Sequence, residues 1–500
     1  MHTTVGSTAQ DRPPTARGDR SRWIALLVLC LGMLMIVLDA TVVNVALPSI
    51  QRDLGFSQSS LAWVVNAYLI AFGGLLLLAG RLGDLVSRRG VFLAGLGVFT
   101  GASLLCGLAQ SQQVLIAARF VQGVGGAMTS AVILGMIVTM FPERGAQAKA
   151  IGVYSFVAAA GGSVGLLAGG ALTQGLNWHW IFFINLPFGV VTALLAPRLL
   201  PRDRGVGFGG GADVAGALLV TGSLMLGVYT IVKPAAEHGW SDGRTLGLGG
   251  VSLALLAGFV ARESSARNPL VPLRIFRSRA VSGANVIQAL TVAGMFGMFF
   301  LGVLYLQRVL GYDSLRTGLA FLPVTLVIAT LSLRYSDRLT MRFGARTVLP
   351  PGLALIAVGL GLVAQVRVDG SYLTDVLPAM LLMGTGIGVS FPALATLAMS
   401  GATQRDAGLA SGLVNTTTQV GAALGLAVLA TLSATRSQQL LGRGEPAAAA
   451  LTGGYRLAFL IAAALVVAAI AVAVTVLRPE RRAFEEIEAP EDECDCAEAA

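Results

Sequence analysis

One carboxylate, Asp39, lies well inside a long apolar run at residues 23–48. An acidic side chain within membrane hydrocarbon is costly and usually faces a protein interior or a water-filled cavity, often on an ion pathway. Burial also disfavours the charged form of a carboxyl group. Such a group can take up a proton from one side of a membrane and release it to the other, or it can form half of a fixed structural ion pair. We favour the proton-coupling interpretation for Asp39.

Arg119 is a second charge inside an apolar run, at residues 112–141. If the first run crosses a membrane outward and this run returns inward, Asp39 lies about 24 Å from the inner start and Arg119 about 10 Å from the outer start. Both then fall in the outer half of a hydrocarbon layer of roughly 30 Å. The two side chains can meet if these two runs are neighbours, and on that condition we predict an Asp39–Arg119 pair whose strength changes when Asp39 is protonated. In the alternative, Arg119 bonds backbone carbonyl groups of the first run, and the sequence leaves both open.

The composition places these charges in a membrane protein. The chain has 500 residues, of which 55% are hydrophobic and 12% charged; soluble domains average roughly 25% charged residues. The net charge of +9 fits basic loops on the cytoplasmic side of a membrane, and we expect no nucleic-acid partner.

Apolar runs of about 20 residues are long enough to cross a bilayer as helices. Most of the 35 Lys and Arg residues fall on the side of the N-terminus, which predicts that both termini are cytoplasmic in a bacterial inner membrane. We predict fourteen spans, at residues 23–48, 61–81, 90–109, 112–141, 149–173, 180–200, 213–233, 245–262, 283–307, 316–333, 348–368, 374–400, 406–434 and 453–477.

Two loops repeat a pattern across the chain. GRLGDLVSRRG (80–90) and LRYSDRLTMRFGAR (333–346) align Asp84 with Asp337 and Arg89 with Arg342. Duplicated halves are a known transporter architecture. We therefore predict five regions: a disordered cytoplasmic arm (1–22), a six-helix bundle (23–200), a linker with two extra membrane helices (201–279), a second six-helix bundle (280–477) and an acidic cytoplasmic tail (478–500).

Several motifs, spread over nearly the whole chain, carry a resemblance. They include LDATVVNVALP (38–48), GRLGDLVSRRG (80–90), LIAARFVQGVGGA (115–127) and WHWIFFINLPFG (178–189). The chain resembles the 14-span drug:proton antiporters of the major facilitator superfamily, the EmrB/QacA type. The resemblance implies an all-α membrane fold of two six-helix bundles plus two inserted helices. It also implies export of lipophilic drugs or antibiotics in exchange for protons, by alternating access.

The fifth predicted span departs from this family. GGSVGLLAGG (161–170) has Leu166 where the antiporter motif has proline, so the family's proline-dependent bend is missing. Small residues spaced by four permit close helix packing, and the candidates are Gly161, Gly165, Gly169 and Gly170.

The 80–90 loop resembles the superfamily's motif between spans 2 and 3, which implies a latch that favours one access state. In the superfamily the loop carboxylate, here Asp84, contacts the opposite half, which the span count places near 406–409; Asp406 there would repel it. The alternative is a basic loop that only anchors topology. The latch candidates are Gly80, Gly83, Asp84, Arg88, Arg89, Asp337 and Arg342.

Few amide side chains occur within the spans. A mainly apolar cavity with scattered polar groups fits bulky hydrophobic molecules. The candidates for a substrate cavity are Asn44, Asn66, Gln122, Asn285, Gln288, Asn415 and Gln419.

Other functions fit less well. An enzyme needs a cluster of catalytic groups or metal ligands, but His2, His179 and His238 are scattered and Cys494-x-Cys496 has no accompanying ligands. We expect no enzyme activity, no metal and no cofactor, with protons as the coupling ion. The expected partners are a lipophilic small molecule and the lipid bilayer; the oligomeric state stays open, and a monomer is consistent with the sequence. A transporter of a native metabolite and a non-transporting membrane sensor remain as alternatives.

Overall fold

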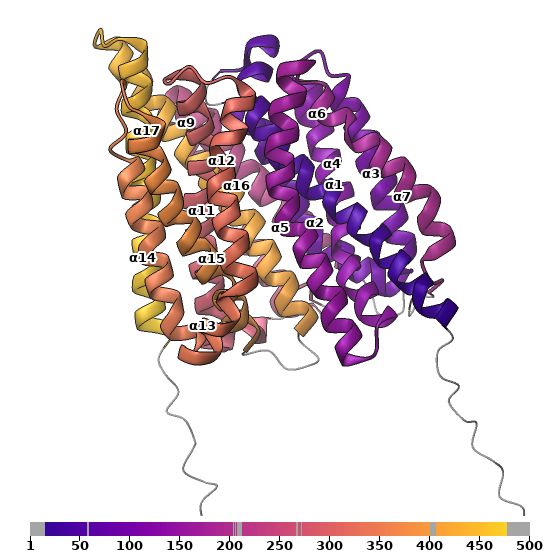
Figure 1. Cartoon of the computed structure of the whole chain (residues 1–500). Coiled ribbons are helices and arrows are strands. Elements are labelled where there is room, and N and C mark those ends of the chain that lie inside the picture. Colours follow the sequence, from indigo (N-terminus) through magenta and orange to yellow (C-terminus); the bar gives the residue numbers. More distant parts are fainter. Residues whose placement is uncertain are drawn as a thin grey trace, which may run out of the picture.

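Long helices, many of them running the full height of the molecule, form almost all of the structure (Figure 1). The computed structural model describes residues 16–57, 60–203, 205, 207, 213–266, 269–271, 273–400 and 407–477. No β-strand occurs among these residues. We call the end where α1 begins and α17 ends the terminal end, and the other the opposite end.

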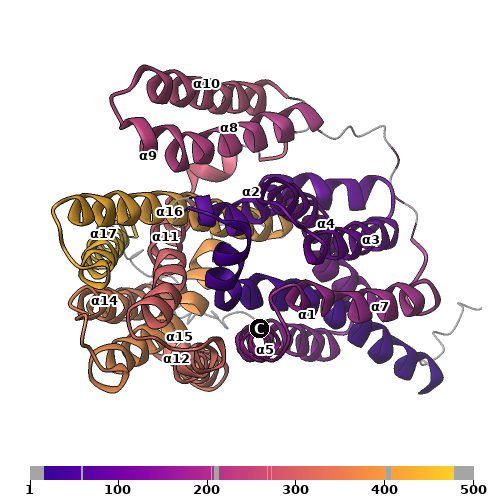
Figure 2. The same cartoon turned by 90° about the horizontal axis from the view of Figure 1, so that it is seen from above.

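The helices form two bundles and an inserted pair, which Figure 2 shows from above. The first bundle contains α1 (Ala16–Leu54), α2 (Trp63–Leu85), α3 (Arg88–Gly107), α4 (Gln112–Met140), α5 (Arg144–Gly175), α6 (Trp180–Phe183) and α7 (Asn185–Leu199). The second contains α11 (Arg279–Arg308), α12 (Ser314–Arg334), α13 (Ser336–Phe343), α14 (Ala345–Val363), α15 (Leu377–Ser400), α16 (Ala407–Gly442) and α17 (Ala447–Val476). Between them in sequence come α8 (Val214–Val232), α9 (Pro234–His238) and α10 (Gly243–Ser265), and short η1 (Ser60–Ala62), η3 (Leu273–Arg277) and η4 (Tyr372–Val376) segments complete the set.

The predicted spans correspond to these helices. Thirteen helices among the described residues are long and apolar enough to cross a membrane. The remaining predicted span, 149–173, lies within the 32 residues of α5. The prediction of an all-α membrane protein is therefore confirmed.

The predicted disordered arm is wrong at its boundary. Residues 16–22 are helical and continue into α1. Arg22 then holds this first part of α1 against α4, since its Nη1 donates to Met140 O (3.4 Å) and lies 3.3 Å from Glu143 Oε1. Residues 1–15 and the predicted acidic tail, with Cys494 and Cys496, lie outside the described residues.

The inserted helices form a separate layer on one side of the two bundles (Figure 2). α8 packs against α10 on its outer side and against α2 and α16 on its inner side. Because α2 belongs to the first bundle and α16 to the second, α8 spans the junction between them.

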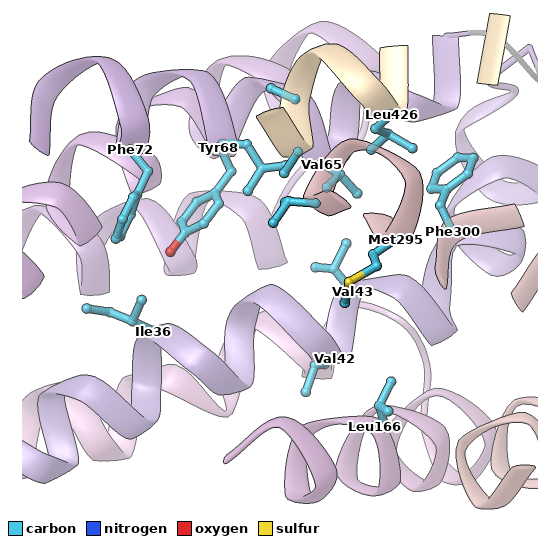
Figure 3. Packing of buried hydrophobic residues seen from close by; sticks show 14 of the residues in the cluster. Ile36, Val42, Val43, Val65, Tyr68, Phe72, Leu166, Met295, Phe300 and Leu426 are labelled. Atoms are coloured by element: carbon cyan, nitrogen blue, oxygen red, sulfur yellow. The ribbon is translucent and has the colours of Figure 1, made fainter. Parts of the chain in front are cut away.

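Apolar packing is continuous across the junction of the bundles. One buried cluster contains residues of both bundles, and Figure 3 shows Val43 of α1 beside Met295 of α11. The glycines predicted to pack helices divide between two neighbours: Gly161, Gly165 and Gly169 face α1, whereas Gly170 faces α12 of the second bundle.

The bundles meet closely toward the opposite end. Gln307 Nε2 of α11 donates to Val45 O of α1 (3.0 Å), and the Leu315 backbone N–H of α12 donates to Gln174 Oε1 of α5 (3.2 Å). A Cβ added at Gly318 of α12 would lie 2.6 Å from the carbonyl oxygen of Leu166. α5 is one continuous helix through Leu166, so this crossing is made by an unbroken helix.

We predict that Gly170→Ala destabilises the closed junction. An added Cβ would lie 2.7 Å from Ser314 O and 3.0 Å from Leu315 Cα, and overpacking of this kind costs about 1–3 kcal/mol. Gly162→Ala on the same helix is the control, because no atom lies within 4 Å of its added Cβ. Thermal unfolding of the purified protein in detergent should show a lower midpoint for Gly170→Ala only. Equal midpoints for the two variants would contradict the close crossing.

Candidate functional site

A buried ion pair lies at the centre of the first bundle. Arg119 Nη1 of α4 is 2.5 Å from Asp39 Oδ2 of α1. The Asp39 side chain is 0% exposed and the Arg119 side chain 1% exposed. The structure thus brings together the two charges that the depth argument placed at the same level.

Neutral polar side chains complete the hydrogen bonding of this pair. Gln122 Nε2 and Asn185 Nδ2 both donate to Asp39 Oδ1, at 2.7 Å and 3.1 Å. Gln122 Oε1 accepts from Arg119 Nη1 (2.6 Å). Ser103 Oγ of α3 accepts from both amides, at 2.7 Å from Gln122 and 3.3 Å from Asn185. We call Asp39, Arg119, Gln122, Asn185 and Ser103 the charge centre.

Arg119 also contacts the second helix. Its Nε donates to Val64 O of α2 (2.9 Å), and its guanidinium lies 4.5 Å from the ring centroid of Tyr68. Each of the two interpretations of Arg119 is therefore partly correct. Arg119 contacts Asp39, and it also bonds a backbone carbonyl group, but that carbonyl group belongs to α2 rather than to α1.

Local sequence explains how these side chains converge. Arg119 and Gln122 are three residues apart on α4, so they lie on one face of the helix. Glycines on α4 let the neighbouring helices approach closely. A Cβ added at Gly125 would lie 2.8 Å from Gly95 O of α3, and a Cβ added at Gly123 would lie 2.9 Å from Ala71 Cβ of α2. The motif that resembles the family thus combines the arginine with the small residues that bring helices close enough to reach it.

The charge centre supplies hydrogen-bond donors to both oxygens of the Asp39 carboxylate. The carboxylate accepts three hydrogen bonds, one of them from a guanidinium. Hydrogen bonds and an opposite charge both favour the charged form of a carboxyl group, and a buried pair is tolerated when its remaining polar atoms are also bonded. Removing one partner leaves the other as an uncompensated buried charge.

Sequence analysis missed two members of the charge centre and assigned a third elsewhere. Ser103 and Asn185 were not predicted, although Asn185 stands within the WHWIFFINLPFG motif. Gln122 was predicted for a substrate cavity, but in this structure it bonds to Asp39 and Arg119. The signal available for Asn185 was a buried amide in a span that otherwise reads as apolar.

The 80–90 loop forms a local network at the terminal end. Arg88 Nη2 lies 2.9 Å from Asp84 Oδ1, and Arg88 Nη1 donates to Gly135 O of α4 (3.2 Å). Gly83 faces Val132 of α4, and a Cβ added at Gly80 would lie 3.9 Å from Ala131 Cβ. A cavity of about 850 Å³ opens beside this loop, lined by residues that include Arg22, Arg81, Asp84 and Asp203.

Asp203, which sequence analysis missed, caps α3 from the segment after α7. Its carboxylate accepts from Ser87 Oγ (2.6 Å) and from the backbone N–H groups of Arg88 (2.6 Å) and Arg89 (3.3 Å). Partial burial opposes ionisation, but these hydrogen bonds lower the pKa of Asp203. Gly205 N–H also donates to Val86 O (2.8 Å), so the chain leading to the inserted helices is fastened to the predicted latch loop.

The opposite-half partner predicted for Asp84 cannot be placed. Residues 401–406 lie outside the described residues, as do the side chains of 407–411. The matching loop of the second bundle differs in structure, because a separate helix, α13, lies between α12 and α14. Arg342 is exposed on α13 and its guanidinium lies 5.3 Å from the Phe343 ring; the Asp337 side chain is not described.

The remaining cavity candidates occur in both bundles. In the second bundle, Gln288 Nε2 of α11 donates to Thr418 Oγ1 (2.9 Å) and Asn285 Oδ1 accepts from Thr417 Oγ1 (2.8 Å), both of α16. Asn415 is exposed. The others are Asn44, whose Nδ2 donates to Ala40 O (3.2 Å), and Asn66 and Gln419, which carry buried polar atoms without a hydrogen-bond partner.

The fold and the charge centre define a membrane transporter. The chain belongs to the Major Facilitator Superfamily, because the model of that family matches residues 29–426. The puromycin resistance protein Pur8 of Streptomyces alboniger is 41% identical over 451 residues, 89% of each chain. The cephamycin export protein CmcT of Amycolatopsis lactamdurans is 40% identical over 412 residues, covering 82% of this chain and 84% of its own.

Solved structures agree on the fold. A bacterial homologue of the human lysosomal transporter Spinster, in an inward-facing and unoccupied conformation, superposes with a TM-score of 0.67 at 17% identity, covering 91% of this chain and 97% of that chain. The predictions of a major facilitator fold and of a transporter rather than an enzyme are confirmed.

We predict that Arg119→Met destabilises the protein more than the double variant Asp39→Asn/Arg119→Met. The single change leaves the Asp39 carboxylate buried without its cation, at a cost of about 3–5 kcal/mol, whereas the double change removes both charges. Thermal unfolding in detergent and the yield of folded protein measure the difference. An equal decrease of the unfolding midpoint in both variants would show that Arg119 does not compensate the charge of Asp39.

A separate prediction concerns Asp203. Loss of a helix-capping carboxylate costs about 1 kcal/mol, so Asp203→Ala should lower the unfolding midpoint at neutral pH, while Asp203→Asn should retain most of the cap. Because the folded-state pKa of Asp203 is lowered, its contribution is present above the unfolded value, about 3.9, and is lost as the pH falls through the folded value. The difference between wild type and Asp203→Ala should therefore persist at mildly acidic pH. A difference that vanishes well above pH 4 would contradict this assignment.

Proposed function

We propose that this protein exports lipophilic antibiotics or drugs across a bacterial inner membrane in exchange for protons, by alternating access, with both termini in the cytoplasm. The observation that carries the proposal is the fully buried Asp39 carboxylate, bonded to Arg119 in the middle of a transporter bundle. The printed functions of the relatives, puromycin resistance and cephamycin export, support an antibiotic as the substrate class.

Protonation of Asp39 changes the charge centre without leaving Arg119 unpaired. The proton converts the carboxylate to a carboxylic acid, and the guanidinium keeps its charge. Arg119 retains two other acceptors, Gln122 Oε1 and Val64 O. Asn185 Oδ1 is buried without a hydrogen-bond partner, so rotation of this amide would let it accept from the new O–H group, since an amide offers both a donor and an acceptor.

α1 connects this proton site to the junction of the bundles. Val45, six residues beyond Asp39 on the same helix, accepts the hydrogen bond from Gln307 of α11. A shift of α1 that follows protonation of Asp39 would therefore act directly on a contact between the two bundles. Alternating access requires such a link between the ion site and the moving halves.

Protonation of Asp39 also favours movement of α1 relative to α4. In its ionised form Asp39 is fixed by three hydrogen bonds from two helices. Loss of its negative charge removes the strongest of these attractions, the one to Arg119, and so lowers the free energy needed to separate α1 from α4.

The test is uptake of a fluorescent lipophilic cation into inverted membrane vesicles, with and without an imposed pH gradient. Wild type should accumulate the dye only when the gradient is present. Asp39→Asn should lose gradient-driven accumulation, because a neutral amide cannot take up and release the proton. Glu445→Gln, an exposed carboxylate between α16 and α17, is the control and should transport normally.

Gradient-driven uptake that survives in Asp39→Asn at equal expression would refute Asp39 as the coupling site. Normal uptake of the dye without any gradient would refute proton exchange itself. Failure of wild type to move any lipophilic dye, with gradient-driven movement of a native metabolite, would instead favour the alternative transport function.

A further inference from the structure

A second group of buried carboxylates lies outside the charge centre, in the inserted helices. Asp213 is the N-cap of α8, and Glu263 lies near the C-terminal end of α10, the helix packed against it. The residues are 6% and 3% exposed. Figure 2 shows α8 and α10 as the layer on one side of the bundles. Nothing in the proposed transport cycle uses either side chain.

The hydrogen bonds of the two carboxylates are unequal. Asp213 Oδ1 accepts from the Gly216 backbone N–H (2.9 Å) and from Arg262 Nε (3.1 Å). Glu263 Oε2 accepts from the Val271 backbone N–H (2.8 Å). Glu263 Oε1 is buried and has no hydrogen-bond partner.

The unpartnered oxygen and an oxygen of Asp213 both lie beside Gly216. A Cβ added at Gly216 would lie 2.9 Å from Asp213 Oδ2 and 3.0 Å from Glu263 Oε1. These distances place the two oxygens within 6 Å of each other, on a space that no side chain of Gly216 fills. The absence of a side chain at Gly216 leaves the space into which both oxygens project.

Among the residues that the structure describes, the cation bonded at this site lies on Asp213. Asp213 and Arg262 are the charged groups that act on Glu263, and Arg262 bonds to Asp213. The elements packed nearby carry Arg81 and Asp84 on α2, Arg274 and Arg277 on η3, and Arg279 at the start of α11. No cation is bonded to Glu263 among the ion pairs of the described residues.

We propose that Asp213 and Glu263 form a second proton-binding site, in which one proton is held on Glu263 Oε1 and shared with Asp213 Oδ2. Two carboxylates in one buried site repel each other strongly when both are ionised, and they retain one proton between them. That proton supplies the donor that Glu263 Oε1 otherwise lacks. On deprotonation the bound proton leaves to solvent and the site carries two negative charges against the single Arg262.

The site also fastens the inserted helices to the second bundle. Glu263 bonds the backbone of Val271, and Leu270 and Val271 belong to a small apolar cluster with Val281 of α11 and Leu413 of α16. Repulsion after deprotonation would push Glu263 away from Asp213 and weaken its hold on this segment. The attachment is therefore tight when the site is protonated and looser as the pH rises.

Infrared difference spectroscopy of the purified full-length protein tests the proposal. Wild type should show a carboxylic-acid C=O band that titrates with pH, and Glu263→Gln should remove it. Asp213→Asn removes the neighbouring charge, so the Glu263 band should disappear at a lower pH than in wild type. Asp39→Asn and Asp242→Asn, the latter at the half-buried N-cap at the far end of α10, should leave this band unchanged.

Hydrogen–deuterium exchange gives a second readout that does not depend on transport. Exchange at Leu270 and Val271 should rise with pH in wild type by more than the intrinsic chemical rate, and Glu263→Gln should abolish the excess, because its amide can donate to Asp213 at any pH. A folded wild-type protein without a Glu263-dependent band, or with exchange that follows the intrinsic rate alone, would overturn the proposal. Neither result would bear on Asp39.

Discussion

The first bundle is organised around the need to keep one buried negative charge compensated. Asp39 on α1 has no contact with solvent, so α4 must supply Arg119 and the helices around it must supply neutral donors. Five helices contribute to this arrangement: α1, α4, α3 and α7 through side chains, and α2 through the Val64 carbonyl group. The glycines of α4 are as necessary as its arginine, because an arginine held farther from α1 and α2 could not reach both acceptors.

The positive charge of Arg119 is compensated by several acceptors rather than by Asp39 alone. Arg119 donates to three different acceptors, so it stays bonded when any one of them is lost. A buried pair in which each charge had only the other could not survive neutralisation of the acid without stranding the base, a loss of several kcal/mol. In the proposed cycle, Gln122 Oε1 and Val64 O therefore keep Arg119 bonded when Asp39 is neutral.

The charged residues within the apolar runs were predicted, whereas neutral polar residues there and carboxylates at helix ends were missed. The rise per residue of two helices and the thickness of a bilayer placed Asp39 and Arg119 at the same depth, but the resemblance was needed to make their helices neighbours. Asn185 and Ser103 were missed because a neutral polar residue in a span carries no sign of its partner. Asp203, Asp213 and Glu263 stand at helix ends, where a carboxylate is unremarkable in sequence, and only the tertiary fold brings Asp203 to α3. The helical start of α1 was missed because residues 16–22 are polar and give no hydrophobic signal.

The contacts between the bundles are of a kind suited to repeated breaking. At the opposite end they are two neutral hydrogen bonds and a close crossing of α5 and α12 at glycines. A neutral hydrogen bond contributes only about 1 kcal/mol net, so separation of the bundles there exposes no stranded charge. Leu166 makes this crossing through its backbone carbonyl group, which a leucine presents from an unbroken helix. The missing proline therefore leaves the junction intact, with α5 continuous through residue 166.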